Sequence, residues 1–360
     1  MDTVKFLVMA GDGIGEEITE ATLEVLRAAD ARFGLGLAFE EAEIGLKALA
    51  KHGTTLPEGV LERARASDGI ILGPISHLDY PAPEEGGVNI SGVVRTKLDL
   101  YANVRPARTR PGLPAKGGSF DLVIMREATE GFYPDRNMFA GRAEFMPDPD
   151  TAITLRKISR KASERIARRS YELAMKRRKK VTLIHKANTF RLSDGLFLEA
   201  CHQVAKDFPE VETDEAIVDA MAALLVRQPE RYDVICATNF HADILSDLAS
   251  ELSGSLGLAG SVNAGDDLCC AQAQHGSAPD IAGQDRANPS SLILSAAMLL
   301  DWIADKRGLD NFGAAARAID AAVDAALARP ETRTPDLGGA LGTRAFATQI
   351  AGRITEGVAD

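Results

Sequence analysis

The chain has 360 residues, of which 45% are hydrophobic and 26% are charged, and its formal net charge is −11. This composition is typical of a globular protein of two or three domain-sized units that can bury a large core without disulfides. The acidic balance argues against nucleic acid as the main partner, although a local arginine cluster can still bind a small anion. We expect no membrane span and no signal peptide. The four cysteines form no C-x-x-C pair, which favours reduced thiols and a cytoplasmic location.

The first predicted element is a strand over residues 4–10, which a glycine turn joins to a helix with helically spaced apolar residues from Ile18 onward. Further buried strands are predicted at 69–73, 121–125, 181–184 and 233–236, and helices at 161–175, 289–303 and 314–328. The stretches 105–118 and 134–152 are rich in proline and charge, which predicts irregular surface segments. Strands that alternate with helices predict an α/β fold with a largely parallel sheet.

The glycine turn is similar to a dinucleotide-binding loop but does not complete its pattern. Gly11, Gly13 and Gly15 give G-x-G-x-G, and Glu16 stands where the third glycine of G-x-G-x-x-G would follow. Glu16 and Glu17 also place two carboxylates at the helix N-terminus, where a pyrophosphate would bind. We therefore predict a tight turn between strand and helix, and not a standard Rossmann site.

Two aspartates, Asp243 and Asp247, lie four residues apart in a predicted helix and therefore share one of its faces. Ile244, Leu245 and Leu248 are expected to pack on the opposite side. Carboxylate oxygens of this kind suit a hard cation such as Mg²⁺ or Mn²⁺. In isolation, such a pair is more often a solvated helix face than a metal site.

Three arginines end or follow short apolar runs. Arg126 ends the strand predicted at 121–125, Arg95 follows two valines, and Arg105 precedes a proline. At strand ends, arginines can bind carboxylates with both arms of the guanidinium fork. The alternative for each is an ordinary surface salt bridge.

A long and specific pattern runs nearly from one end of the chain to the other, in the segments GDGIGEE (11–17), RTKLDLYANVRPAR (95–108), DLVIMREATEGFY (121–133), ISRKASERIARR (158–169), IHKANTFRLSDGLF (184–197), DVICATNFHADILSDLASELSGSLGL (233–258), HGSAPDIAG (275–283), ANPSSLILSAAML (287–299) and TPDLGG (334–339). In these segments the chain resembles the β-decarboxylating dehydrogenases, which act on isopropylmalate, isocitrate, homoisocitrate or tartrate and D-malate. The resemblance implies a two-lobed α/β fold with a central, mostly parallel sheet that differs from a standard Rossmann fold. Residues 1–100 and 254–360 would form a large cofactor-binding lobe, and residues 101–253 a small lobe with the dimer contacts.

The same resemblance implies an NAD-dependent and Mg²⁺- or Mn²⁺-dependent oxidative decarboxylation of a (2R)-malate that carries a substituent on C3. The substrate is then a hydroxy-diacid or hydroxy-triacid, and the enzyme is a homodimer in which the partner subunit supplies Lys186 and Asp219. Lys186, aided by Asp219, would accept the hydroxyl proton, and Tyr133 would protonate the carbon from which CO₂ has left. The implied site residues are Arg95, Arg105, Arg126, Asn89 and Ser91 for the substrate, Tyr133, Lys186 and Asp219 for catalysis, Asp219, Asp243 and Asp247 for the metal, and His275, Gly276, Ser277, Ala278, Asp280 and Asn288 for the cofactor. Asp280 favours NAD, because a carboxylate accepts from both ribose hydroxyls and repels a 2′-phosphate.

Several positions depart from the family pattern. Ser91 and Gly92 stand where isopropylmalate enzymes carry leucines, and Asn89 and Ser91 reverse the order found in isocitrate enzymes. The extra arginine that homoisocitrate enzymes carry nearby is missing. Gln272 replaces a glutamate near the nicotinamide, and Ala242 replaces a glycine. These departures predict a small or polar substituent on C3. Isocitrate-, homoisocitrate- and tartrate- or D-malate-like substrates then compete with isopropylmalate, and a catalytically weak regulatory role is a further alternative.

Overall fold

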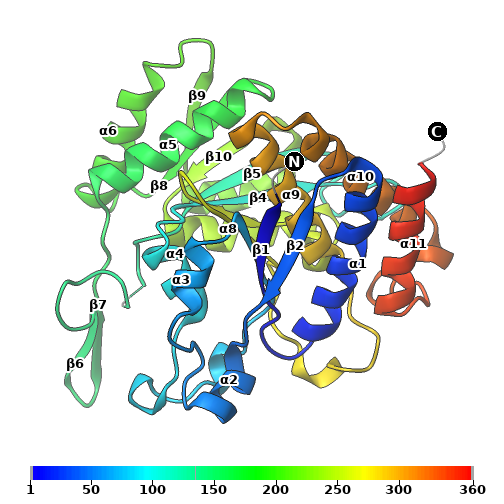
Figure 1. The fold of residues 1–360 in the computed structure, drawn as a ribbon. Coiled ribbons are helices and arrows are strands. Elements are labelled where there is room, and N and C mark those ends of the chain that lie inside the picture. Colours follow the sequence, from blue (N-terminus) through cyan, green and yellow to red (C-terminus); the bar gives the residue numbers. More distant parts are fainter. Residues whose placement is uncertain (1–2, 134, 358–360) are drawn as a thin grey trace.

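The computed structural model describes residues 3–133 and 135–357, and one ten-stranded sheet crosses the whole molecule (Figure 1). In sheet order the strands are β2 (Leu37–Glu41), β1 (Val4–Met9), β3 (Gly69–Leu72), β12 (Cys269–Gln272), β11 (Val262–Ala264), β4 (Ala102–Arg108), β5 (Asp121–Glu127), β10 (Val234–Ala237), β8 (Lys180–His185) and β9 (Glu212–Ile217). The antiparallel pairs of this sheet all involve β4 or β11, and its other pairs are parallel. This mixed, mostly parallel order confirms the predicted α/β fold and differs from that of a standard Rossmann fold.

Helices cover both faces of the sheet (Figure 1). They are α1 (Gly15–Phe33), α2 (Gly45–His52), α3 (Val60–Arg65), α4 (Ile90–Lys97), α5 (Arg160–Met175), α6 (Ser193–Ala205), α7 (Val218–Arg227), α8 (Asn239–Ser253), α9 (Ser290–Arg307), α10 (Asp310–Leu327) and α11 (Thr343–Glu356). In β1, Phe6 and Val8 pack with α1, α9, α10 and α11, whereas Leu7 and Met9 pack with α3 and α4. The alternation arises because successive strand side chains point to opposite faces, and both faces are buried here. None of the described helices is long and apolar enough to cross a membrane.

The hydrophobic core consists of four clusters, and the buried residues of each cluster come from only one of two parts of the chain. The buried members of two clusters come from residues 4–100 and 258–354, and those of two others come from residues 101–252. In the second part, one cluster lies under α5 and α6 and the other under α7 and α8. The division into a large lobe of 1–100 and 254–360 and a small lobe of 101–253 stays a prediction, which this distribution of core residues supports.

Two segments predicted to be irregular contain strands. Residues 105–108 belong to β4, and its arginines are accommodated there because they pair with acidic side chains from distant helices, as Arg108 does with Asp320 and Asp324. Within 135–152, β6 (Glu144–Asp148) and the start of β7 (Thr151–Thr154) form a hairpin that projects from the rest of the molecule (Figure 1). Its side chains are exposed, so no buried apolar face marks it in the sequence. Residue 134 lies outside the described residues.

The glycine segment forms the tight turn expected between β1 and α1. Gly11 and Gly13 adopt φ values of +76° and +57°, which favour glycine, and α1 begins at Gly15. The backbone N–H of Ile14 donates to the carbonyl of Ser277 at 2.8 Å, and a Cβ on Gly13 would lie 2.0 Å from that oxygen. The turn therefore packs closely against residues predicted to bind the cofactor.

Candidate active site

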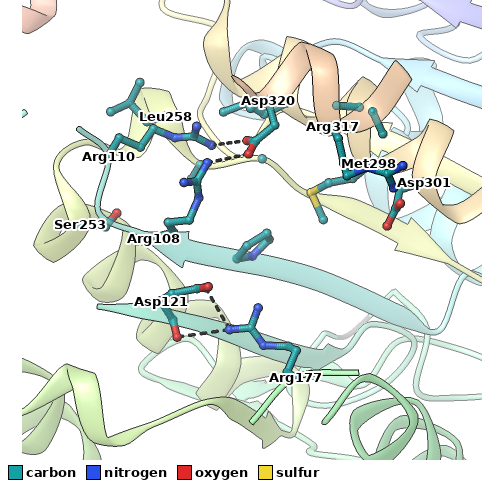
Figure 2. A pocket seen from close by; sticks show the side chains of 16 residues that line it. Arg108, Arg110, Asp121, Arg177, Ser253, Leu258, Met298, Asp301, Arg317 and Asp320 are labelled. Carbon is teal, nitrogen blue, oxygen red and sulfur yellow. Dashed lines mark hydrogen bonds and ion pairs between the residues drawn. The ribbon is translucent and has the colours of Figure 1, made fainter. Parts of the chain in front are cut away.

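A cavity of about 300 Å³ lies where β4, β5, α4 and α8 meet, and all five of the predicted substrate residues line it. Its lining includes Asn89, Ser91, Gly92, Arg95, Arg105, Arg126, Tyr133, Arg136, Asp243, Gln272, Gln274, His275 and Gly276. A second cavity, of about 310 Å³, lies at the opposite end of the β4–β5 pair, beside Arg108 and Asp121 (Figure 2). None of the predicted site residues lines that second cavity.

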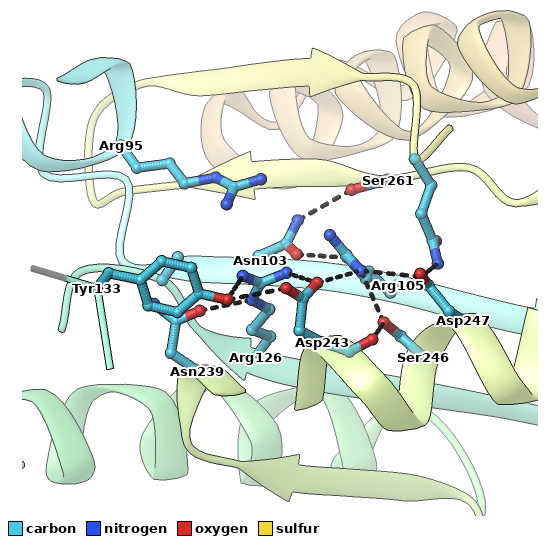
Figure 3. Close-up of polar contacts among 12 residues, drawn as sticks. Arg95, Asn103, Arg105, Arg126, Tyr133, Asn239, Asp243, Ser246, Asp247 and Ser261 are labelled. Atoms are coloured by element: carbon cyan, nitrogen blue, oxygen red, sulfur yellow. Dashed lines mark hydrogen bonds and ion pairs between the residues drawn. The ribbon is translucent and has the colours of Figure 1, made fainter. Parts of the chain in front are cut away.

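Asp243 stands at the centre of the first cavity's polar contacts (Figure 3). Its Oδ1 forms ion pairs with Arg126, from β5, and with Arg105, from β4, whose Nη1 lies 3.2 Å away. The hydroxyl of Tyr133 donates to Oδ2 of Asp243 at 2.8 Å, and Nη2 of Arg126 donates to the Tyr133 oxygen at 2.8 Å. Two arginines and a phenol therefore converge on one carboxylate, which shows directly that this arrangement can bind such a group.

Neutral side chains hold the two arginines in place from behind. Nε of Arg126 donates to Asn239 at 2.7 Å, and Nε of Arg105 donates to Asn103 at 2.6 Å. Both arginines are buried, at 2% and 6% exposure, so their geometry is fixed by packing as well as by hydrogen bonds. Because the amides carry no charge, they orient the guanidinium groups without neutralising them.

The charges in this cavity change the acidity of its groups. Burial alone would raise the pKa of Asp243, but the charges of Arg126 and Arg105 hold it below its usual value. Burial, reinforced by the charge of Arg126, lowers the pKa of Arg105 to about 10 and that of Arg95 to about 9. An anionic ligand would relieve this repulsion. Burial also raises the pKa of Tyr133, so its phenol keeps its proton near neutral pH.

Asp247 lies one turn beyond Asp243 on α8, as predicted, and the same arginine lies between them. Nη1 of Arg105 is 3.5 Å from Asp247, whose side chain is 56% exposed, and Gln274 donates to Asp247 at 2.9 Å. The two carboxylates thus converge on one positive charge, which is an arrangement that suits a divalent cation. Of the residues predicted on the opposite side of α8, Leu245 is buried, but Ile244 is 54% exposed, so that expectation was wrong for Ile244.

Arg95 lies in helix α4 and not at the end of a strand. The two valines before it suggested a strand, but Asn89 caps the helix by accepting from the backbone N–H of Gly92 at 3.0 Å. From the helix, Nε of Arg95 donates to Asn263 at 2.9 Å and Nη2 donates to Gln272 at 3.3 Å. Its side-chain partners are both neutral amides, so the positive charge of Arg95 is left for a ligand.

Lys186 and Asp219 form a separate pair that does not line this cavity. Nζ of Lys186 donates to Asp219 at 2.6 Å, and this hydrogen bond holds the pKa of Asp219 below its usual value. The backbone N–H of Lys186 donates to Asp194, a fully buried carboxylate that also pairs with Arg156 at 2.5 Å. Within the described residues of one chain, no three acidic, histidine or cysteine side chains group to hold a metal.

The predicted cofactor residues lie on the loop after β12. His275 donates from Nδ1 to the carbonyl of Gly276 at 2.9 Å, and its Nε2 is buried without a partner among the described residues. Burial lowers the pKa of His275, so the ring is neutral and Nε2 is an acceptor. A nicotinamide dinucleotide offers hydroxyl and amino donors, so this orphaned acceptor fits such a cofactor.

Of the other predicted cofactor residues, Ser277 and Asn288 have local hydrogen-bond partners, whereas the side chain of Asp280 is free to meet a ligand. Ser277 shares a hydrogen bond of 2.7 Å with Ser76, and Ala278 adopts a positive φ of 37°. Asn288 donates to Asp336 at 2.9 Å and accepts from the start of α9. The side chain of Asp280 is exposed to solvent on a short 3-10 turn. It is therefore accessible to a ligand.

The sequence and the fold match one family. The model of the isocitrate/isopropylmalate dehydrogenase family matches residues 5–352. The chain belongs to this family. It is 44% identical over 347 residues to the isocitrate/homoisocitrate dehydrogenase of Thermus thermophilus, which covers 96% of this chain and 97% of the relative. The 3-isopropylmalate dehydrogenase of Sulfurisphaera tokodaii is 39% identical over 92% of this chain and 94% of its own.

A solved structure supports the assignment. The isocitrate dehydrogenase from Methylococcus capsulatus superposes with a TM-score of 0.87 at 37% identity, covering 98% of this chain and 100% of that one. These findings confirm the family and the fold that were predicted from the sequence. As a member of the isocitrate/isopropylmalate dehydrogenase family, the chain is a β-decarboxylating dehydrogenase that acts on a small hydroxy acid.

Some residues at this cavity were not singled out from the sequence. Arg136 and Gln274 line the cavity, and Asn103, Asn239 and Ser246 orient its arginines. The amides could have been found from their place beside predicted site residues, because Asn239 precedes Asp243 by one helical turn. Arg136 carries no such signal, since its place at the cavity depends on the space beside Gly92, which lies in a different segment.

Proposed function

We propose that this enzyme uses NAD⁺ and Mg²⁺ or Mn²⁺ to oxidise and decarboxylate a (2R)-malate whose C3 substituent is small or polar. The observation that carries the proposal is the convergence of Arg105, Arg126 and Tyr133 on the Asp243 carboxylate. Charged donors, a protonated phenol and a carboxylate meet there within hydrogen-bonding distance. That combination suits a substrate with two carboxylates, one of which leaves as CO₂.

The arginines would bind and orient the substrate carboxylates. Arg95 has only amide partners, so its whole positive charge is available to a substrate carboxylate. Arg105 and Arg126 already pair with Asp243, so their hydrogen bonds would be divided between Asp243 and the substrate. The fixed guanidinium planes place the C2–H and C3–carboxylate bonds in one orientation, which reduces the entropy that the reaction must lose.

A divalent cation would bind between Asp243 and Asp247, with Asp219 of the partner subunit as a third ligand. When bound, the cation would polarise the C2 oxygen, and NAD⁺ would accept the hydride from C2. The exposed Asp280 supports NAD over NADP, because its charge would repel a 2′-phosphate.

Two side chains would move protons. Lys186 of the partner subunit, held by Asp219 of the partner subunit, would accept the proton of the C2 hydroxyl. The C3–carboxylate bond then breaks and CO₂ leaves. The electron pair of this bond forms a double bond between C2 and C3, and the C2 carbonyl becomes an enolate. Tyr133, protonated because burial raises its pKa, would donate its proton to C3 and complete the 2-oxo acid. We propose a homodimer for this reason, since Lys186 does not line the cavity of its own chain.

Absorbance of NADH tests the proposal. The protein, Mn²⁺ and either NAD⁺ or NADP⁺ are mixed with D-malate, 3-isopropylmalate, isocitrate or homoisocitrate. We expect turnover of at least one of these acids, with NAD⁺ preferred, and CO₂ released in equal amount. No turnover of any acid would mean that the chain is a weak or regulatory homologue.

Gln272 contacts Arg95 through a neutral amide and therefore leaves the positive charge of Arg95 free to bind a substrate carboxylate. Its Oε1 accepts from Arg95 and from Asn263, and its Nε2 donates to Ser91 at 2.9 Å. In Gln272→Glu, a carboxylate would pair with Arg95 and compete with the substrate, so we expect KM to rise about tenfold with little change in kcat. Steady-state kinetics measure this, and Gln272→Met separates the added charge from the lost hydrogen bonds. An unchanged or lower KM in Gln272→Glu would contradict this role.

A further inference from the structure

We infer that Arg136 binds the C3 substituent of the substrate and that this substituent carries a carboxylate. The inference rests on the proposed function and narrows its substrate class from a small or polar substituent to an anionic one. It concerns a side chain that lines the same cavity as Arg95, Arg105 and Arg126 but comes from the segment after β5.

The guanidinium of Arg136 is held rigidly at the cavity wall. Its side chain is only 5% exposed, and its guanidinium carbon, Cζ, lies 4.8 Å from the centre of the Tyr133 ring. Nε and Nη2 donate to the two oxygens of Asp135, at 2.9 and 3.2 Å, and Nη1 donates to the carbonyl of Ala128 at 3.3 Å. Asp135 is itself fixed, because Asn89 donates to it at 2.9 Å. An arginine with so many anchors is already ordered before a ligand arrives.

Gly92 makes room for this guanidinium. The glycine lies inside helix α4 and does not need the conformational freedom of glycine there, since its φ is not positive. A Cβ at this position would lie 2.4 Å from Nη2 of Arg136, 2.7 Å from Asp135 and 2.8 Å from Asn89. A larger residue at position 92 would therefore displace the arginine from the wall where the C3 substituent is expected. The space beside Ser91 and Gly92, where isopropylmalate enzymes carry leucines, is therefore occupied by the guanidinium of Arg136.

Arg136 still has donors for a ligand. A guanidinium carries five N–H groups, and the three contacts above use one each on Nε, Nη1 and Nη2. One N–H on each terminal nitrogen has no acceptor among the described residues. The two terminal nitrogens of a guanidinium can together donate two parallel hydrogen bonds to one carboxylate. An alkyl substituent placed there would remove water from both donors without replacing its hydrogen bonds.

The charge balance of the cavity favours an additional anion. Among the described residues, four arginines line the cavity, and Asp243 is the only acidic side chain that does so. Asp135 offsets part of the Arg136 charge from outside the lining, but Arg95 contacts only amides. A malate supplies two carboxylates for Arg95, Arg105 and Arg126. A third carboxylate, on the C3 substituent, would meet Arg136.

The test compares substrates that differ only at C3. We expect the wild-type enzyme to prefer carboxymethyl- or carboxyethyl-malates, which are isocitrate and homoisocitrate, over 3-isopropylmalate and D-malate in kcat/KM. In Arg136→Gln, kcat/KM for the preferred carboxyalkyl substrate should fall about 10- to 100-fold, mainly through KM. The loss for D-malate or 3-isopropylmalate should be at least tenfold smaller. Where these acids bind without turnover, their inhibition constants supply the comparison.

Two further variants separate binding from folding. Arg136→Lys keeps the charge but not the fork, so its loss should be intermediate. Gly92→Leu should displace Arg136 and shift the preference towards 3-isopropylmalate, even if Arg136→Gln folds poorly. A wild-type preference for an alkyl substituent, or an equal loss on all substrates in Arg136→Gln, would overturn the inference but leave the proposed reaction intact. If no acid in the panel is oxidised, the proposed function fails first.

Discussion

Asp243→Asn is expected to lower kcat/KM about 100-fold or more at a fixed millimolar Mn²⁺ concentration. The carboxylate is the proposed metal ligand, and it also pairs with Arg126 and Arg105 and accepts from Tyr133. The isosteric amide keeps the shape but removes the charge, which weakens metal binding and leaves two buried guanidinium groups without their anion. Mn²⁺ affinity, measured by titration calorimetry, should fall in parallel with activity.

Asp247→Asn is the matched control on the same helix. Asp247 is more exposed than Asp243, contacts Arg105 at the longer distance of 3.5 Å and also accepts from Gln274. The decrease in kcat/KM of Asp247→Asn should therefore be smaller, and raising the Mn²⁺ concentration should restore most of the activity. Full activity of Asp243→Asn at ordinary metal concentration would falsify the proposed metal site.

Strands with apolar sequences could be predicted, whereas charged ones could not. The sequence of β1 is a short apolar run followed by a glycine turn, so a local pattern was enough to identify it. β4 contains Arg105, Pro106 and Arg108, which suggest a surface loop. Its charges are stabilised by Asp243 and Asp320, which lie far away in the sequence. A local pattern carries no information about such partners.

The site was predictable where its residues share one element, and less so where it depends on several. Asp243 and Asp247 share a helix face, so their spacing alone predicted that the two side chains lie together, and the proposal of a metal between them needed the family resemblance as well. Arg95 was placed at a strand end because of its two valines, but the Asn89 cap and the buried pair Ile90 and Val94 favour a helix. Arg136 could not be predicted, because its place depends on the space that Gly92 leaves.

The proposed sharing of the site between subunits can be tested by mixing two inactive variants. Lys186 pairs with Asp219 and does not line the cavity that contains Asp243, so the proposed site joins Asp243 of one chain to Lys186 of the other. Lys186→Met and Asp243→Asn should each be nearly inactive alone. In a heterodimer of the two, one site would combine the intact Asp243 with the intact Lys186, and the other site would carry both substitutions.

Random re-association of equal amounts of the two variants should therefore restore roughly a quarter of the wild-type activity, because half of the dimers are mixed and each has one intact site. Subunits can be exchanged by unfolding and refolding the mixture, with each variant refolded alone as the control. Differently tagged chains allow the mixed dimers to be purified, and these should show about half of the wild-type turnover per dimer. If Lys186 acted within its own chain, both sites of the mixed dimer would stay defective and no activity would return.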